Sequence, residues 1–246
     1  MSDATKSNSM PLKESTQQSR RSFLRGSAAA VAGIVTAGVA AESAQSFLHP
    51  RSVLAQSTLT PDAALKELMD GNGRFVSGKT TAHEHDLTIL KQHLEEKQEP
   101  YAAVLSCADS RVPVEIIFDQ TIGHLFVTRV AGNIITPEII GSLEYGVAVL
   151  GTKVILVLGH SNCGAVKAAV AGKSVPGQIS VLYPHIQPAV DQAGPDYKAV
   201  TRANAKIQAK LLSQASTVVS EKIKEGGLKV VAGYYDIGSG AVTLLT

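Results

Sequence analysis

The sequence is short of several features that would point to a function directly. It has no tryptophan and only two cysteines, and aromatic residues make up 4% of its 246 residues. It also has no internal repeat, no long linker and no run of like charges, so we interpret the folding part as one domain. A hydrophobic share of 44% is enough for that domain to bury one well-formed core.

The sequence also lacks a real excess of charge, although its formal net charge is +2. Six of the 23 Lys and Arg residues, but only three of the 21 Asp and Glu residues, lie within residues 1–55. The remaining chain therefore carries 17 basic and 18 acidic side chains and is close to neutral. This balance argues against nucleic acid or an anionic membrane as a partner of the folded part.

Residues 1–55 have the order of a targeting segment. A polar stretch leads to Ser-Arg-Arg-Ser-Phe-Leu-Arg at residues 19–25, and Gly26–Ala41 then contains no charge. A charged region before a mild apolar run resembles a bacterial twin-arginine signal peptide. The apolar run has about 16 residues, whereas a membrane-spanning helix needs about 20, so a cleaved signal is favoured over a membrane anchor.

The signal resemblance implies export of a folded protein to the periplasm or the exterior, with no stable membrane insertion after cleavage. Small residues suit cleavage after Ala41 or Ala55, and we favour Ala55 because folded sequence begins near Thr60. The expected organisation is a signal and spacer over residues 1–55 and one catalytic domain over residues 56–246.

Helical and strand patterns alternate along the expected domain. Thr60-Pro61 marks a helix start, and a leucine stripe predicts a second helix at Leu87–Lys97. Continuous apolar runs predict buried strands within residues 102–105, 125–127, 154–158 and 229–235. Helical patterns cover residues 137–150, 165–171 and 198–224. The sequence thus predicts an α/β fold with a mostly parallel β-sheet flanked by helices.

Two polar motifs directly follow two of these strands. Ser-Cys-Ala-Asp-Ser-Arg occupies residues 106–111, and Gly-His-Ser-Asn-Cys-Gly occupies residues 159–164. Ligands of open α/β sheets bind at the carboxyl ends of the strands, so we expect the two motifs to converge on one site.

The two cysteines, Cys107 and Cys163, lie in these motifs and allow two interpretations. In an exported protein, a pair of cysteines predicts a disulfide. However, His160 lies three residues before Cys163, and two thiolates with one imidazole form a ligand set typical of catalytic zinc with an open fourth position. The ligand types and their spacing alone leave zinc and a disulfide about equally favoured.

Asp109 and Arg111 favour the zinc interpretation. The two residues are close enough in sequence to form a charge-assisted hydrogen bond that orients the carboxylate. A carboxylate beside a zinc site can accept a proton from water or ligate the metal itself. An isolated pair of this kind would be a surface salt bridge worth about 0–1 kcal/mol, but the adjacent candidate ligand makes a catalytic role the better interpretation.

The two motifs together resemble the signature of the β-class carbonic anhydrases. The similarity extends over nearly the whole expected domain and includes Phe-Asp-Gln at 118–120, Leu-Phe-Val-Thr-Arg-Val-Ala-Gly-Asn at 125–133 and Ala-Gly-Tyr-Tyr-Asp at 232–236. Two features depart from the pattern. Val130 stands where many relatives have asparagine, and the missing tryptophan removes an aromatic side chain that some relatives use at an inhibitory bicarbonate site.

The family resemblance implies a role for each motif residue. Cys107, His160 and Cys163 would ligate zinc. Asp109 would be either a fourth ligand or the acceptor of a hydrogen bond from zinc-bound water, and Arg111 would hold it off the metal. Zinc-bound hydroxide would attack carbon dioxide, and bicarbonate would leave as water returns. The implied partners are therefore carbon dioxide, bicarbonate and water.

The resemblance also implies a homodimer or homotetramer, in which N-terminal helical arms wrap around the neighbouring subunit. The segments at residues 61–76 and 87–97 fit such arms, or pack on their own subunit. Three rival interpretations keep part of the pattern: a carbonyl sulfide or carbon disulfide hydrolase on the same fold, a non-catalytic zinc-binding protein, and a disulfide-bonded periplasmic binding protein.

Overall fold

The computed structural model describes residues 57–82 and 98–246. The expected signal segment and the expected helix at Leu87–Lys97 lie outside these ranges. Within them, no helix combines the length and the apolar character that a membrane crossing requires.

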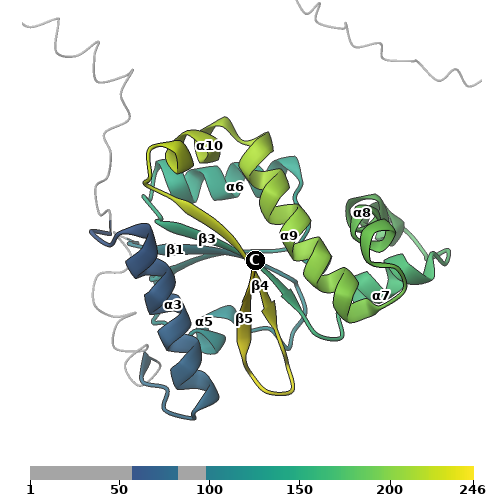
Figure 1. Cartoon of the computed structure of the whole chain (residues 1–246), viewed down its shortest axis with the longest axis horizontal. Helices are drawn as coiled ribbons and strands as arrows, with labels where there is room; N and C mark the ends of the chain where they lie inside the picture. The colour runs from purple at the N-terminus through teal and green to yellow at the C-terminus, as the bar shows by residue number, and fades with distance from the viewer. Residues whose placement is uncertain (1–56, 83–97) are drawn as a thin grey trace, which may run out of the picture. The chain divides into compact units, whose positions relative to one another are not determined.

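A five-stranded sheet lies at the centre of the fold, with strand order β2-β1-β3-β4-β5 (Figure 1). The strands are β1 (Ala102–Ser106), β2 (Leu125–Arg129), β3 (Val154–His160), β4 (Lys229–Tyr235) and β5 (Val242–Leu245). Strands β2, β1, β3 and β4 are parallel to one another, and β5 is antiparallel to β4. The mostly parallel α/β sheet predicted from the four apolar runs is confirmed, and β5 is an edge strand that the sequence pattern did not predict.

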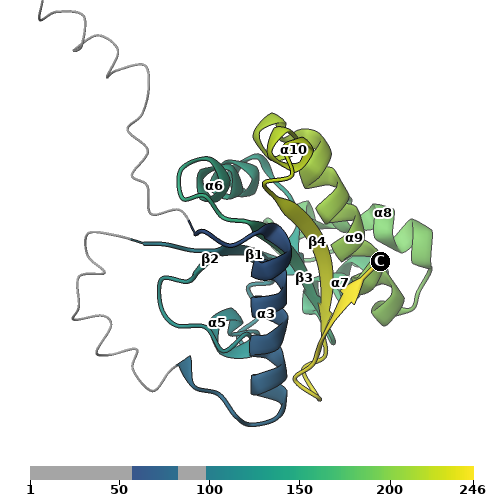
Figure 2. The same ribbon diagram turned by 60° about the vertical axis from the view of Figure 1, so that its left-hand side comes forward.

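Helices connect the strands and cover both faces of the sheet. They are α3 (Pro61–Val76), α5 (Val114–Ile117), α6 (Pro137–Ala148), α7 (Gly164–Ala171), α8 (Tyr183–Ala193), α9 (Tyr197–Ala215) and α10 (Thr217–Lys224), with short 3-10 turns η2 (Ala131–Asn133) and η3 (Ile179–Leu182). Helices α6, α9 and α10 lie on one face of the sheet, and α3 and α5 lie on the other (Figure 1 and Figure 2).

The central strands bury both of their faces because their side chains alternate between two hydrophobic layers. In β1, Ala102 and Val104 pack in the layer below α3 and α5, while Ala103 and Leu105 pack in the layer below α6 and α9. Every residue of β1 and β3 is buried. The site-bearing ends of these strands are therefore fixed on both sides by packed side chains.

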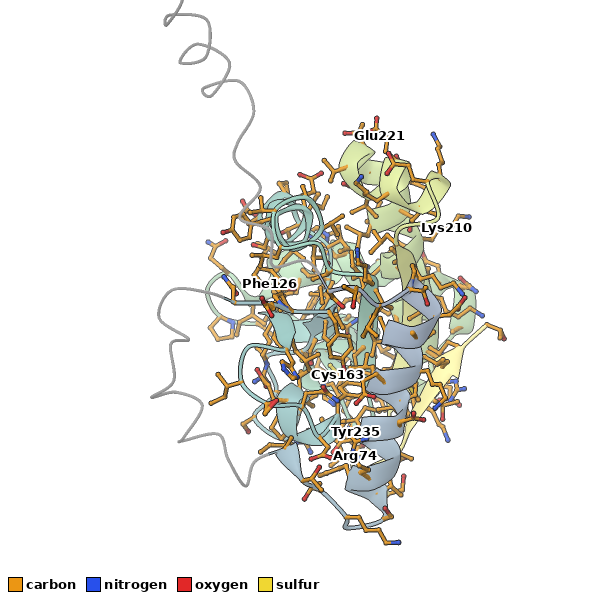
Figure 3. The ribbon with its side chains drawn as sticks, turned by 90° about the vertical axis from the view of Figure 1, so that its left-hand side faces the viewer. Arg74, Phe126, Cys163, Lys210, Glu221 and Tyr235 are labelled. Atoms are coloured by element: carbon orange, nitrogen blue, oxygen red, sulfur yellow. The ribbon has the colours of Figure 1, made fainter. Side chains whose placement is uncertain are left out.

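Helix α3 begins as predicted and packs on its own subunit. Thr60 caps it, with its hydroxyl accepting a hydrogen bond from the Ala63 N–H at 3.2 Å. Leu68 is fully buried in the core. Arg74, labelled in Figure 3, lies in the last turn and forms an ion pair with the buried carboxylate of Asp119. In the described part of the chain, α3 thus packs on the sheet of the same subunit.

The single helix expected over residues 198–224 is wrong, because two helices occupy this stretch. The break lies at Ser216, whose backbone is extended (φ −104°, ψ 119°). Its hydroxyl accepts a hydrogen bond from the Val219 N–H at 3.0 Å and so caps α10. The same hydroxyl donates to Oε1 of Glu144 on α6 at 2.6 Å, which ties the break to the neighbouring helix.

Candidate metal centre

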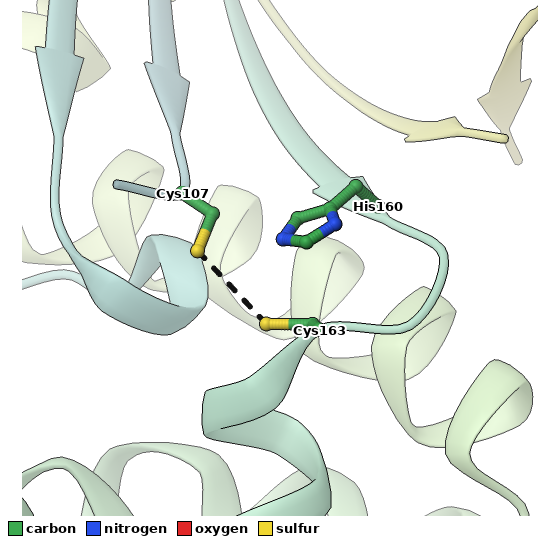
Figure 4. Close-up of side chains that lie close together, drawn as sticks. All are labelled: Cys107, His160 and Cys163. Carbon is green, nitrogen blue, oxygen red and sulfur yellow. Dashed lines mark hydrogen bonds between the residues drawn. The ribbon is translucent and has the colours of Figure 1, made fainter. Parts of the chain in front are cut away.

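The two sequence motifs converge at the carboxyl ends of two adjacent strands. Strands β1 and β3 pair in register, with Ser106 opposite Leu158. Cys107 directly follows β1, His160 is the last residue of β3, and Cys163 is the N-cap of α7. Figure 4 shows the three side chains pointing toward one another. The two motifs therefore meet at the carboxyl ends of β1 and β3, as the sequence pattern predicts.

The geometry of the three side chains suits a metal ion and differs from that of a disulfide. One ligand atom from each residue lies within 4.8 Å of the other two. The two sulfur atoms are 3.9 Å apart and unbonded, whereas a disulfide needs about 2.05 Å. The exposed fractions of Cys107, His160 and Cys163 are 4%, 0% and 2%. The structure thus favours the metal interpretation of the two cysteines.

The imidazole of His160 presents its free nitrogen to this cluster. Its Nδ1 donates a hydrogen bond to the carbonyl oxygen of Ser161 at 2.9 Å, which leaves the lone pair on Nε2. Nε2 is buried and has no hydrogen-bond partner among the described residues. An unpaired buried acceptor is costly, and a metal ion would satisfy it. The donor set consists of two sulfur atoms and one nitrogen of an imidazole ring that a hydrogen bond at its other nitrogen fixes. Zinc prefers such a set.

The two thiols are electrostatically coupled. A hydrogen bond from Cys163 is the largest influence on Cys107. Together with the neighbouring imidazole of His160 and the Gly132 N–H, 3.3 Å from Cys107 Sγ, it lowers the pKa of Cys107 to about 4 despite burial. The same hydrogen bond and burial raise the pKa of Cys163. Without a cation, one thiol of the pair keeps its proton. A divalent cation would hold both as thiolates and release that proton.

Asp109 lies beside the cluster and is bound by Arg111. Nε of Arg111 donates to Oδ1 of Asp109 at 2.9 Å, and Nη2 donates to Oδ2 at 2.8 Å. Oδ2 lies 3.8 Å from Nε2 of His160. The hydrogen bonds from Arg111 hold the pKa of Asp109 well below its usual range. The structure therefore places an ionised carboxylate next to the candidate ligands, with both oxygens engaged by a guanidinium group.

Arg129 is a site residue that reasoning from the sequence did not single out. It ends β2, and its Nε donates to the carbonyl oxygen of Cys107 at 2.9 Å. Its Nη2 donates to the carbonyl oxygen of Asp109. One guanidinium group thus fixes the loop that carries both a candidate ligand and the carboxylate. The sequence feature that could have predicted this role is the position of Arg129 at the carboxyl end of a strand expected to lie in the same sheet as the two motifs.

Comparison with known proteins agrees with this geometry. The family described as "Carbonic anhydrase" matches residues 102–242, a range that contains all three candidate ligands. Carbonic anhydrase 2 of Mycobacterium tuberculosis (strain CDC 1551 / Oshkosh) is 37% identical over 194 residues, covering 75% of this chain and 92% of that protein.

Two solved structures share the fold. The β-carbonic anhydrase CafA of Aspergillus fumigatus superposes with a TM-score of 0.59 at 28% identity, covering 75% of this chain and 89% of that one. A structure from a study of two tetrameric β-carbonic anhydrases of Sordaria macrospora gives a TM-score of 0.58 at 25% identity, covering 74% and 96%. The likeness therefore extends over most of the length of each protein.

Proposed function

The chain belongs to the carbonic anhydrase family, and from this premise we propose that it hydrates carbon dioxide reversibly to bicarbonate and a proton at the centre formed by Cys107, His160 and Cys163. It is an enzyme of the β class, a lyase with zinc as its cofactor. The observation that carries the proposal is the buried, unpaired Nε2 of His160, which faces two unbonded sulfur atoms.

The three candidate ligands would hold zinc, and their surroundings prepare them for it. Bound zinc lowers the pKa of water so that hydroxide is available near neutral pH. The bond from His160 Nδ1 to the carbonyl oxygen of Ser161 fixes the ring and leaves Nε2 as the atom that would bind zinc. Burial of all three side chains strengthens electrostatic interactions at the centre, because little bulk water reaches it.

Asp109 would accept a hydrogen bond from the attacking water rather than bind zinc as a permanent ligand. Both of its oxygens are bound by Arg111, which keeps the carboxylate ionised and sets its direction. An ionised carboxylate beside the cluster can accept a hydrogen bond from water and orient it for attack on carbon dioxide. Arg111 thus holds Asp109 in the position where it accepts a hydrogen bond.

The proposed reaction is tested with zinc-loaded protein in a stopped-flow pH-indicator assay. We expect hydration of carbon dioxide that rises with zinc content. Absence of activity from about pH 6 to 9 at full zinc load would contradict the proposal. Parallel assays with carbonyl sulfide and carbon disulfide distinguish the hydrolase alternative, which predicts turnover of those gases in preference to carbon dioxide.

We also propose that the chain is exported and that it forms a homodimer or homotetramer. Export is supported by the charged and apolar regions of residues 19–41. Replacing Arg20 and Arg21 with lysine should keep the protein in the cytoplasm, and unchanged secretion would contradict a twin-arginine signal.

Assembly is supported by the edge strand β2, whose residues Leu125–Thr128 are only partly buried in one chain. The study of the related Sordaria macrospora enzymes describes them as tetrameric. Light scattering after gel filtration should therefore give a mass of two or four chains, and a monomer at micromolar concentration would contradict this part of the proposal.

A further inference from the structure

Helix α9 carries two buried amide side chains on the face that it turns toward the metal centre. Asn204 has an exposed fraction of 0% and Gln208 of 1%, and they lie one helical turn apart. Apart from Thr201, whose hydroxyl bonds within its own helix, the other buried positions of the helix are apolar, such as Ala205 and Leu212. Burying an amide is unfavourable unless its donors and acceptors are bonded, so the bonds of these two side chains are informative.

The two amides form a connected network with the segment that follows β2. Asn204 Nδ2 donates to the carbonyl oxygen of Gly132 at 2.9 Å, and Gln208 Oε1 accepts from the Ile135 N–H at 2.7 Å. Gln208 Nε2 donates to Asn204 Oδ1 at 3.2 Å and to the carbonyl oxygen of His185 at 2.9 Å. The orientations are consistent, because turning either amide around would place two donors or two acceptors face to face.

The segment held in this way has a backbone that needs external support. Gly132 has φ +77° and the next residue, Asn133, has φ +43°, a region that side-chain-bearing residues seldom adopt. Such conformations persist only where the surrounding structure fixes them. Asn204 bonds the peptide that joins these two residues, and Gln208 bonds the chain two residues further on.

The same segment carries a backbone donor that reaches a candidate zinc ligand. The Gly132 N–H lies 3.3 Å from Cys107 Sγ. A Cβ on Gly132 would lie 2.9 Å from Cδ1 of Ile186, so the segment is packed closely on α8 as well. The direction of this N–H depends on the backbone that Asn204 fixes.

We propose that Asn204 and Gln208 are positioning residues for the zinc centre. They hold the Gly132 N–H on Cys107 Sγ, and this hydrogen bond orients the thiolate and increases the affinity of the site for zinc. The proposal rests on the proposed function only in taking Cys107 as a zinc ligand. Its test measures zinc binding and needs no turnover of carbon dioxide.

The test compares zinc affinity, measured by competition with a chromogenic chelator, in the wild type and in Asn204→Leu. Leucine keeps the volume but removes both polar groups. We expect zinc affinity to fall several-fold and by at most about 10- to 100-fold, the range found when a direct partner of a metal ligand is removed, because Asn204 acts on that partner, Gly132. In the cobalt-substituted protein, the thiolate-to-metal charge-transfer band should shift, because the hydrogen bond to a coordinating sulfur has changed. Unchanged affinity together with an unchanged cobalt spectrum would overturn the proposal.

Two further variants make the result independent of stability. Ser216→Ala removes a buried cap between α9 and α10, far along the chain from the zinc ligands, and should lower the unfolding temperature while leaving zinc affinity and the cobalt band unchanged. An equal loss of affinity in Ser216→Ala would contradict a specific role for Asn204. Gln208→Met keeps the length of the side chain and replaces Asn204→Leu in the test if that variant does not fold. It should weaken zinc binding several-fold, and unchanged zinc binding in Gln208→Met would also count against the proposal.

A failure of the proposed function would look different. A wild type that binds zinc tightly but does not hydrate carbon dioxide would refute the reaction and leave the positioning role intact. A wild type that hydrates carbon dioxide, together with unchanged zinc affinity in Asn204→Leu and Gln208→Met, would support the reaction and refute the positioning role.

Discussion

The guanidinium group of Arg111 donates to both carboxylate oxygens of Asp109, at 2.9 and 2.8 Å. This two-pronged contact fixes the plane of a carboxylate that lies 3.8 Å from the free nitrogen of His160. Exposed ion pairs of this kind contribute little to stability, and the side chain of Arg111 is 51% exposed. The pair is therefore better explained by the direction it gives the carboxylate than by any contribution to folding.

Replacing Asp109 with asparagine separates this catalytic role from metal binding. The three zinc ligands remain in Asp109→Asn, so we expect full zinc content by metal analysis. Carbon dioxide hydration should fall by about 10²- to 10⁴-fold, because the neutral amide lacks the negative charge that orients the attacking water and loses part of the two-pronged contact with Arg111. Asp70→Asn, which alters only the exposed pair with Lys66 on α3, is the matched control and should keep wild-type turnover. Unchanged hydration in Asp109→Asn would remove Asp109 from the mechanism.

Zinc removal distinguishes thiolate ligands from a disulfide without any substitution. The sulfurs of Cys107 and Cys163 are unbonded in the structure, so a zinc-loaded chain should show little reaction with a thiol reagent. After chelation and without a reductant, two thiols per chain should react, because the metal no longer covers them. The count is taken in denaturant as well, where burial no longer protects either residue. Zero thiols under those conditions would indicate a disulfide and contradict the zinc centre.

The site residues that could be predicted best from the sequence are those that directly follow a recognisable strand pattern. Cys107 and His160 lie at the ends of continuous apolar runs, and such runs form buried parallel strands whose carboxyl ends meet. The four parallel strands and the convergence of the two motifs follow from this pattern, whereas the choice of zinc over a disulfide also needed Asp109, Arg111 and the family resemblance.

The residues that escaped prediction act through contacts between distant segments. Arg129 and Asn204 bond backbone carbonyl groups of the site, and no local pattern reveals which carbonyl a side chain will reach. The break at Ser216 was missed because serine is tolerated inside helices as well as at their caps. Strand β5 is four residues long with a partly exposed face, so its pairing depends on β4 rather than on its own sequence.

The buried carboxylate of Asp119 should make stability depend on pH. Burial raises its pKa, but hydrogen bonds from Arg74 and from two backbone N–H groups outweigh burial and leave the pKa below its usual value. A carboxyl group whose pKa is lower in the folded state stabilises the protein above its unfolded pKa of about 3.9. This stabilisation is lost as pH falls through the lower folded pKa.

Arg74→Met tests this dependence. At pH 7 it should lower the free energy of unfolding by about 1–3 kcal/mol, because a buried carboxylate loses its charged partner. The difference from the wild type should shrink as pH falls below about 4, and it should disappear only below the lowered pKa of Asp119, where the folded protein protonates this carboxylate. Lys66→Met on the same helix removes only an exposed pair and should cost less than about 1 kcal/mol. Denaturant titrations at both pH values measure the differences, and a pH-independent effect of Arg74→Met would contradict the assigned pairing.

Two glycines of α3 should respond in opposite directions to the same substitution. A Cβ on Gly71 would lie 1.8 Å from the backbone carbonyl oxygen of Phe118, whereas a Cβ on Gly73 would meet nothing within 4 Å. Gly71→Ala should therefore lower the free energy of unfolding by at least about 1–3 kcal/mol, because α3 must move away from α5. Gly73→Ala should raise it by about 0.5–1 kcal/mol, because alanine favours the helix and loses less entropy on folding. Equal effects in urea titrations would mean that α3 does not pack on its own subunit as described, since only this packing distinguishes the two positions.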